Sequence, residues 1–387
     1  MLGGMADYDV VIIGAGAAGL TLAHQMGRVN ERRGRPLRTV LVEAPTGPWD
    51  SLLAARWSDL TFVGVDGVEH RSSAAPYVYK MLRSTDVDAH VRATAPEELE
   101  QRELFVDGVE DGPDHATVSA ETPHGGRERF TAHWVFDSRP VAPTSTGRTH
   151  LLQHFRGWFV RASTELFDPA AAVLMDMRPP QPRHGVAFGY VLPLSRREAL
   201  VEYTEFGRTP LSTTEYERAL KDYCDRVGIP DVEVVSAEQG VIPMTDARFA
   251  TRVGRRLFRV GTAGGATRPA TGDTFSGVNR QARAVAEALS VGRVPVPPVP
   301  HRPRHLTMDA IMLRALDSGR VSGADFFTRL FAANRLGDVL AFLDGDSRFP
   351  RELAMGLTTP VAAMSLSTVD HFWHALGSRL THGFRGT

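Results

Sequence analysis

A glycine-rich turn directly after the first apolar segment constrains this chain more than any other feature. Residues Tyr8–Ile13 form a run rich in β-branched side chains, and the run ends in a G-x-G-x-x-G pattern with glycines at 14, 16 and 19. This pattern is typical of a strand–turn–helix unit in which the backbone approaches a dinucleotide pyrophosphate and the helix N-terminus faces the phosphates. We therefore predict nucleotide contacts by Gly14, Ala15, Gly16, Ala17 and Gly19.

A carboxylate at the end of the next apolar run fits the same unit. Residues 39–43 read as a second strand ending in Glu43, near the roughly 20-residue spacing of the acid that holds an adenosine ribose. The glycine pattern alone is weakly specific, so a glycine-rich turn in an ordinary α/β domain is the alternative. The ordered series of strand, helix, second strand and terminal acid favours dinucleotide binding.

A second glycine-rich element lies late in the chain. Residues 257–265 read as a strand entering a glycine-rich loop, and Thr271–Asp273 and an alanine-rich helix around residues 280–289 follow. In two-part flavoproteins such an element closes over the pyrophosphate and ribityl chain. Two glycine-rich elements therefore favour FAD over NAD as the tightly held nucleotide, and we predict cofactor contacts by Gly261, Gly272 and Asp273.

The stretch between these elements has the pattern of an inserted antiparallel sheet. The strand-like runs occupy residues 151–160, 171–177, 185–193 and 199–206. A helix then opens at Ser212 with a capping box completed by Glu215. Charged, turn-rich connections between the runs favour an antiparallel sheet over further strand–helix–strand units.

These patterns predict an α/β fold with three regions. We expect an FAD-binding domain of residues 1–150 and 245–300, a substrate-binding sheet domain of residues 151–244, and a helical region of residues 301–387. Within the first region, the local patterns predict a helix at 77–83, a short strand at 90–93, a β-meander over 105–132 and a buried strand at 133–137.

Composition excludes several classes of protein. The chain has 387 residues, enough for a sizeable core, and its formal net charge of −1 gives no electrostatic reason to bind nucleic acid. The single cysteine, Cys224, excludes an intramolecular disulfide framework and a cysteine-based metal site. No stretch reaches the ~18 apolar residues of a transmembrane helix, and the glycine-rich turn begins too early to leave room for a cleaved signal. We expect a cytoplasmic protein.

Several segments, in order along nearly the whole chain, resemble the bacterial lycopene cyclases of the β-cyclase flavoprotein type. The segments are Gln153–Gly157, Tyr190–Leu194, Ala199–Thr204, Gly261–Gly265, Thr271–Gly272 and the tail from Met308 to Leu343. The resemblance implies FAD bound in a glutathione-reductase-like fold, with an apolar isoprenoid or polyene as substrate. It also implies a reaction without net redox change: a terminal double bond is protonated, an internal double bond captures the tertiary cation, and the new ring loses a proton. Reduced flavin, with NAD(P)H as reductant, is implied to support the cation.

Such chemistry requires an acid in a water-free cavity, because water would quench a carbocation. The resemblance points to Glu202, which matches the family's glutamate signature, although a buried structural carboxylate is the alternative. Glu205 would face the opposite side of a regular strand. Asp137 is the secondary candidate, though an acid at such a strand end more often positions a cofactor or loop. His154 is either a base or an ordinary core residue.

Aromatic residues and the helical tail are each open to two interpretations. Four aromatic residues could line a tunnel for a polyene, or they could simply be part of an ordinary core. They are Trp158, Phe159, Phe188 and Tyr190. A polyene dissolves only in lipid, so we expect peripheral membrane contact, with the tail as the candidate surface; a helical bundle core would give the same pattern.

Two departures from the family pattern leave the substrate open. An Arg-Thr-Trp segment usual after the second strand is missing near residues 45–57, and Asp273 stands where the family has an aromatic residue. Another prenylated compound is therefore an alternative substrate. An aromatic hydroxylase is a rival activity, but its Asp-Gly and Gly-Asp motifs are replaced by Asp137-Ser138 and Gly261-Thr262. A flavin-binding protein without activity is a third possibility.

Overall fold

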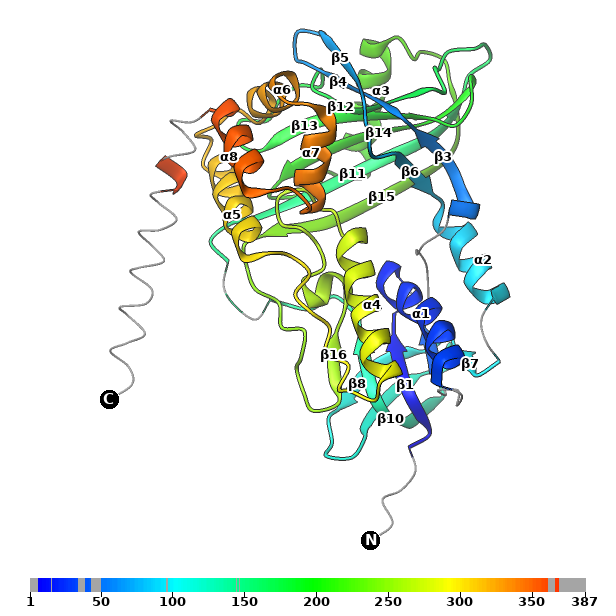
Figure 1. Cartoon of the computed structure of the whole chain (residues 1–387). Coiled ribbons are helices and arrows are strands. Elements are labelled where there is room, and N and C mark those ends of the chain that lie inside the picture. Colours follow the sequence, from blue (N-terminus) through cyan, green and yellow to red (C-terminus); the bar gives the residue numbers. More distant parts are fainter. Residues whose placement is uncertain are drawn as a thin grey trace.

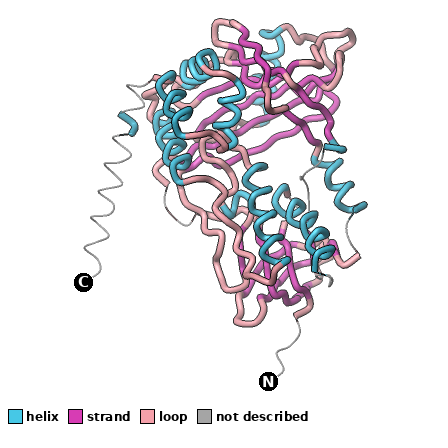
Figure 2. The backbone as a smooth tube through the Cα atoms, viewed as in Figure 1, coloured by secondary structure: helices cyan, strands magenta, loops and turns pink. Residues whose placement is uncertain are grey.

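Two seven-stranded β-sheets, each covered by its own helices, and a two-stranded ribbon make up the described part of the fold (Figure 1). The computed structural model describes residues 6–14, 16–33, 39–42, 50–94, 97–143, 145, 147–360 and 366–368. In the tube view, strands gather into an upper and a lower group, with helices beside each (Figure 2).

The first sheet joins the N-terminal strand to three later parts of the chain. Its strands are β1 (Tyr8–Ile13), β2 (Thr39–Val42), β7 (Leu99–Gln101), β8 (Phe105–Glu110), β9 (Ala116–Glu121), β10 (Arg127–Asp137) and β16 (Leu257–Arg259). The order is β7-β2-β1-β10-β9-β8, with β16 also paired to β10. Parallel pairing joins β7 to β2, β2 to β1, β1 to β10 and β10 to β16. In contrast, β8, β9 and the first half of β10 pair antiparallel and form the predicted meander.

Two helices lie side by side on one face of this sheet. They are α1 (Ala17–Arg33) and α4 (Phe275–Ser290), and short η2 (Gly261–Gly264) precedes α4. The shared core includes Ile12 from β1, Leu20 from α1 and Val285 from α4, all fully buried. This packing aims the N-terminal ends of both helices at the edge where β1 and β16 end, as expected for a unit that binds phosphates.

The second sheet is long and mostly antiparallel. Its strands are β4 (Asp59–Val63), β5 (Glu69–Ser73), β11 (His150–Arg161), β12 (Ala171–Asp176), β13 (Val186–Pro193), β14 (Glu198–Gly207) and β15 (Glu233–Thr245). They follow the order β15-β11-β14-β13-β12-β4-β5. The capped helix α3 (Thr213–Val227) covers one face, and both hydrogen bonds of its predicted capping box are present.

Helices from the C-terminal region cover the other face of the second sheet. They are α5 (Pro303–Asp317), α6 (Gly323–Ala333), α7 (Leu336–Asp344) and α8 (Phe349–Thr358), so residues 303–358 of the region predicted to be helical do contain helices. Within the described residues, none of the helices combines the length and apolar character that crossing a bilayer requires.

Part of the predicted organisation of residues 1–150 is wrong. The strands β4 and β5 lie in the second sheet, where β4 pairs in parallel with β12 and contributes buried Leu60 and Phe62 to that core. Local sequence does not specify which sheet a strand joins, because its partner lies more than a hundred residues away. The domain boundaries themselves stay a prediction.

Two local predictions fail in the segment that joins the sheets. The expected helix at 77–83 is the strand β6 (Tyr79–Leu82), which pairs with β3 (Leu53–Trp57) after the short η1 (Asp50–Leu52). The expected strand at 90–93 lies in the helix α2 (Ser84–Thr94), whose buried Val87 and Val91 have helical spacing. Pairing with a distant strand overrode local propensity in the first case, and a β-branched residue gave a misleading signal in the second.

Candidate active site

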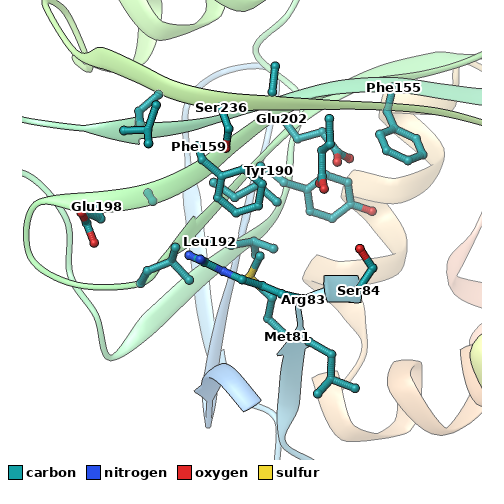
Figure 3. A pocket seen from close by; sticks show the side chains of 18 of the residues that line it. Met81, Arg83, Ser84, Phe155, Phe159, Tyr190, Leu192, Glu198, Glu202 and Ser236 are labelled. Carbon is teal, nitrogen blue, oxygen red and sulfur yellow. The ribbon is translucent and has the colours of Figure 1, made fainter. Parts of the chain in front are cut away.

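A cavity of about 950 Å³ lies between the second sheet and the β6 strand (Figure 3). Strands β11, β13, β14 and β15 form its floor, while Met81 and Arg83 approach from the opposite side; Tyr79 also lines the cavity. The cavity exists because the twisted sheet faces a two-stranded ribbon here, whereas farther along the sheet the C-terminal helices fill the same face.

The predicted acid Glu202 stands on the floor of this cavity. Its cross-strand neighbours are Tyr190 on β13 and Gly157 on β11. Figure 3 shows its carboxyl group beside the Tyr190 ring, directed away from the strand. The β14 alternation confirms that Glu205 faces the other way: it accepts a hydrogen bond from Tyr203, which belongs to the core beneath α3.

The surroundings of Glu202 favour its neutral form. Burial raises the pKa of Glu202 to about 8, and the negative charge of Glu238 acts in the same direction. The buried Thr204 hydroxyl donates a hydrogen bond to Glu202 Oε1 at 2.6 Å, which partly opposes the rise in pKa. A carboxyl group with this pKa still carries its proton at neutral pH and can act as a general acid.

Two tyrosines share the space around Glu202. Burial raises the pKa of Tyr79 to about 12, and the nearby charges of Glu202 and Asp273 add to this rise. Burial also raises the pKa of Tyr190, with contributions from Tyr79 and Glu202. Both phenols therefore stay neutral, and Glu202 is surrounded by uncharged aromatic groups on this side.

The rest of the floor mixes aromatic and aliphatic side chains with polar ones such as Gln153 and Glu198. Phe155 and Phe159 lie on β11 on either side of Gly157, and Leu192 and Leu200 extend the apolar surface. Arg83 lies over the Phe159 ring, with its guanidinium carbon 5.4 Å from the ring centre. Of the four aromatic residues considered for a tunnel, Phe159 and Tyr190 line the cavity. Phe188 lies in the core beneath it, and Trp158 faces α3.

A second cavity, of about 430 Å³, lies where the two glycine-rich turns meet. The first turn contributes Gly16 and Ala17 to its lining, and the second contributes Gly261 and Thr262. Ile242 lines both this cavity and the larger one, so the two adjoin at this side chain. A ligand in the smaller cavity would thus have one end next to the aromatic floor.

Glycines at these turns are required by close contacts. A Cβ at Gly19 would lie 1.9 Å from the Gly14 carbonyl oxygen. Gly261 has a φ of +66°, and a Cβ added to it would lie 2.8 Å from the Cβ of Ala18. Ser138, at the end of β10, fixes the first turn by donating a hydrogen bond to the Ile13 carbonyl oxygen at 2.9 Å. Bare backbone at two turns that line one cavity fits a dinucleotide pyrophosphate.

The remaining predicted cofactor residues have mixed placements. Gly272 lies against Gln153: a Cβ added to Gly272 would be 2.2 Å from the Gln153 Oε1 atom. This contact joins the late loop to the floor of the large cavity, which Gln153 lines. Asp273 accepts a hydrogen bond from the Phe275 backbone N–H at the start of α4, and burial raises the pKa of its carboxyl group. Ala15 and Glu43 lie outside the described residues.

Asp137 and His154 have partners that do not belong to either cavity. Both carboxylate oxygens of Asp137 accept hydrogen bonds from Arg139, at 3.0 and 2.8 Å, so this acid is held in an ion pair and its role in proton transfer stays a prediction. His154 is fully buried on the α3 side of the sheet, 2.8 Å from the Tyr216 hydroxyl, and burial lowers its pKa. Cys224 is also buried on that side, which raises the pKa of its thiol to about 11.

Comparison with known families decides where this chain belongs. The family described as "Lycopene cyclase protein" matches residues 9–369. The chain belongs to the lycopene cyclase family. No curated protein sequence matches this family member significantly.

Solved structures share the fold of this lycopene cyclase family member at low identity. A geranylgeranyl bacteriochlorophyll reductase-like protein from Thermoplasma acidophilum has a TM-score of 0.60 at 13% identity, covering 94% of this chain and 98% of its own. A flavoprotein/dehydrogenase from Cytophaga hutchinsonii gives 0.60 at 13% identity, covering 95% and 99%. The flavin-dependent monooxygenase PieE, in complex with FAD and substrate, gives 0.58 at 15% identity, covering 94% and 72%. These likenesses establish a shared mixed α/β fold.

Two residues of the family member's cavity were missed by sequence reasoning. Tyr79 lies in the segment expected to be helical, although its alternation with Met81 is a strand signal. Glu238 lies on β15, a strand that was not predicted, because residues 233–237 and the glycine at 240 carry no clear apolar alternation. An alternation signal exists only near the end of β15, where Ile242 and Met244 lie two apart.

Proposed function

We propose that this protein cyclises the end of a linear isoprenoid, without net redox change, with FAD bound in a glutathione-reductase-like arrangement. The observation that carries the proposal is Glu202: a carboxyl group with its pKa raised to about 8, in an aromatic cavity that adjoins the glycine-lined one. Family membership supports lycopene or a close carotenoid as substrate. Another prenylated compound is the alternative.

In the proposed reaction, Glu202 transfers its proton to a carbon of the terminal double bond. The tertiary cation that results is captured by an internal double bond, which forms the ring C–C bond and a new cation. Loss of a ring proton then gives the cyclic olefin, so no electrons are gained or lost overall. The faces of Phe155, Phe159 and Tyr190 stabilise positive charge in the cavity and exclude water.

The glycine-lined cavity fits FAD, which the turns at Gly14–Gly19 and Gly261 would hold by its phosphates. When bound in reduced form, with NAD(P)H as the reductant, the flavin supplies an electron-rich ring system beside the cation. Ile242 lines both this cradle and the cavity that holds the acid, and it would set how closely the substrate end approaches.

The test is incubation with lycopene and chemically reduced FAD, followed by chromatographic separation of the products. A cyclase converts substrate without consuming reductant in proportion. An FAD monooxygenase, the activity of the structurally similar PieE, would instead consume one NAD(P)H and one O₂ per product. Stoichiometric consumption of both would exclude our proposal in favour of hydroxylation.

The pH dependence of the reaction should follow the protonation of Glu202. Its acid form predominates below pH 8, so we expect the rate to fall by about tenfold per unit above that pH. The folded protein also holds this proton more tightly than the unfolded chain, whose carboxyl group titrates near 4.5. The stability gained from this group is therefore present at low pH and lost as pH rises through about 8. Rate profiles and denaturant midpoints measured from pH 5 to 9.5 test both effects, and a flat rate profile up to pH 9.5 would contradict the assignment.

Contact with a membrane is part of the proposal, because a polyene substrate partitions into lipid. The helix α8 carries an exposed apolar stripe of Phe349, Leu353 and Leu357, which are 61%, 57% and 65% exposed. The spacing of four residues places the three on one side of the helix. We propose that this stripe meets the bilayer surface.

Two charged substitutions in the stripe should weaken that contact. For Leu353→Glu combined with Leu357→Glu, we expect liposome binding to fall by about 100-fold, because each buried leucine contributes roughly 1.5–3 kcal/mol. Sedimentation with liposomes measures the change. Val65→Glu, an equally exposed position between β4 and β5, is the control and should bind liposomes as the unaltered protein does. Equal loss in both variants would show that α8 is not the contact surface.

A further inference from the structure

The register of the second sheet places another carboxyl group across the cavity floor from Glu202. β14 pairs Glu202 with Gly157 on β11, and β11 pairs the same glycine with Glu238 on β15. Laterally paired residues point to the same face of a sheet, and both glutamates line the large cavity. Adjacent strands lie about 4.8 Å apart, so the strands that bear the two acids are separated by about 10 Å.

The residue between the two acids has no side chain, and the side chains around it fill the space directly above it. A Cβ at Gly157 would lie 3.5 Å from the Cβ of Glu202, 3.4 Å from the Cγ of Glu238 and 2.8 Å from a methyl group of Leu200. Phe155 and Phe159 line the cavity on the two sides of Gly157 along β11. Because Leu200 and Glu238 cover Gly157, the open space between the two acids lies above these side chains, within the large cavity.

The two acids have different surroundings. Glu202 is on an interior strand and is hydrogen-bonded to Thr204, whereas Glu238 is on β15 at the edge of the sheet and is exposed. Within the described part of the chain, the Glu238 carboxyl group has no hydrogen-bond or ion-pair partner. An acid at an open edge can exchange protons with solvent more readily than the half-buried inner acid.

This inference rests on the proposed cyclisation: we propose that Glu238 is a second catalytic residue, which accepts the proton that leaves the newly formed ring. Glu202 gives its proton to the alkene from one side of the cavity, the ring C–C bond forms, and a ring C–H bond breaks. The electron pair of that bond becomes the ring double bond, and the proton passes to the Glu238 carboxylate on the other side. Glu238 then releases a proton to solvent and Glu202 regains one, so both acids return to their starting states.

The experiment compares Glu238→Gln, Glu238→Asp and Glu233→Gln in the full chain loaded with FAD, with lycopene as substrate. We expect Glu238→Gln to cyclise at least about 100-fold more slowly, the loss typical of a missing acid–base group, with flavin content unchanged. Glu238→Asp should recover part of the rate, because it keeps a carboxylate at the cavity floor. Glu233→Gln removes a carboxylate from the same strand outside the cavity lining and should leave the rate unchanged.

Two readouts separate proton acceptance from a structural role. The residual product of Glu238→Gln should show a changed ratio of ring double-bond isomers or a hydroxylated ring, because the cation must then lose a different proton or capture water. The infrared carboxyl band of Glu202 should titrate at lower pH in this variant, because a negative neighbour has been removed while Tyr79 and Tyr190 stay neutral.

The possible failures are distinguishable. If the Glu238→Gln protein cyclises lycopene at the normal rate and gives the normal product, this inference is overturned and the proposed function stays intact. Unaltered protein that forms no ring with lycopene or another linear polyene would overturn the proposed function, and this inference with it.

Discussion

Replacing Glu202 with glutamine is expected to lower the cyclisation rate by about 1,000-fold, within the 10²–10⁴ range of general acid catalysis, while the protein stays folded and yellow. Glutamine has nearly the same shape and can keep a hydrogen bond to Thr204, but its amide cannot protonate an alkene. The cavity floor would be unchanged in volume, so only the transferable proton is lost.

Glu205→Gln is the matched control for this substitution. Glu205 lies on the same strand, but it contacts Tyr203 on the face covered by α3. We expect its rate to stay within about threefold, since its side chain has no access to the cavity. The comparison uses initial rates of ring formation with reduced FAD and lycopene. A Glu202→Gln protein that retained a tenth of the normal rate would remove Glu202 from the mechanism.

Replacing Gly19 with alanine is expected to weaken FAD binding by about 100-fold, so the purified protein would be nearly colourless. The added Cβ would lie 1.9 Å from the Gly14 carbonyl oxygen, and backbone cannot rotate away as a flexible side chain can. The turn must therefore open, which displaces the backbone N–H groups that face the phosphates. Overpacking of this kind costs roughly 1–3 kcal/mol, and about 2.7 kcal/mol corresponds to the stated loss.

Gly356→Ala tests whether this effect is specific to the turn. Gly356 lies in α8, where an added Cβ meets nothing within 4 Å. Its flavin content should match that of the unaltered protein, and alanine favours the helix slightly. Flavin absorbance per polypeptide and fluorescence titration with FAD measure both variants. Full flavin occupancy in Gly19→Ala would contradict a phosphate-binding role for the first turn.

Much of the candidate site could be predicted because it depends on short-range patterns. The turn around Gly14 and Gly19 follows from glycine spacing, and Glu202 and Glu205 were placed on opposite faces by strand alternation alone. The cap of α3 at Ser212 was likewise readable, because its two hydrogen bonds join residues three apart. Each of these features is decided within one turn of helix or a few residues of strand.

Other features were misjudged because distant contacts decide them. Residues 79–82 look helical in isolation, yet they pair with β3 and cover the cavity with Tyr79. The strand β15 has little apolar alternation, because it lies at a sheet edge with one side exposed, and Glu238 was missed with it. Asp137 looked available as an acid, but the structure shows that Arg139 engages both of its oxygens.

The sequence by itself determined the two glycine-rich turns and the strands β11–β14, and the resemblance to the family singled out Glu202 as the candidate acid. Only the tertiary structure decided that Tyr190, Glu202, Gly157 and Glu238 form one row across four strands. The physical reason is that spacing along the chain fixes which way a side chain points. The pKa of a carboxyl group, and the charge opposite it, depend instead on neighbours brought together by pairing between distant strands.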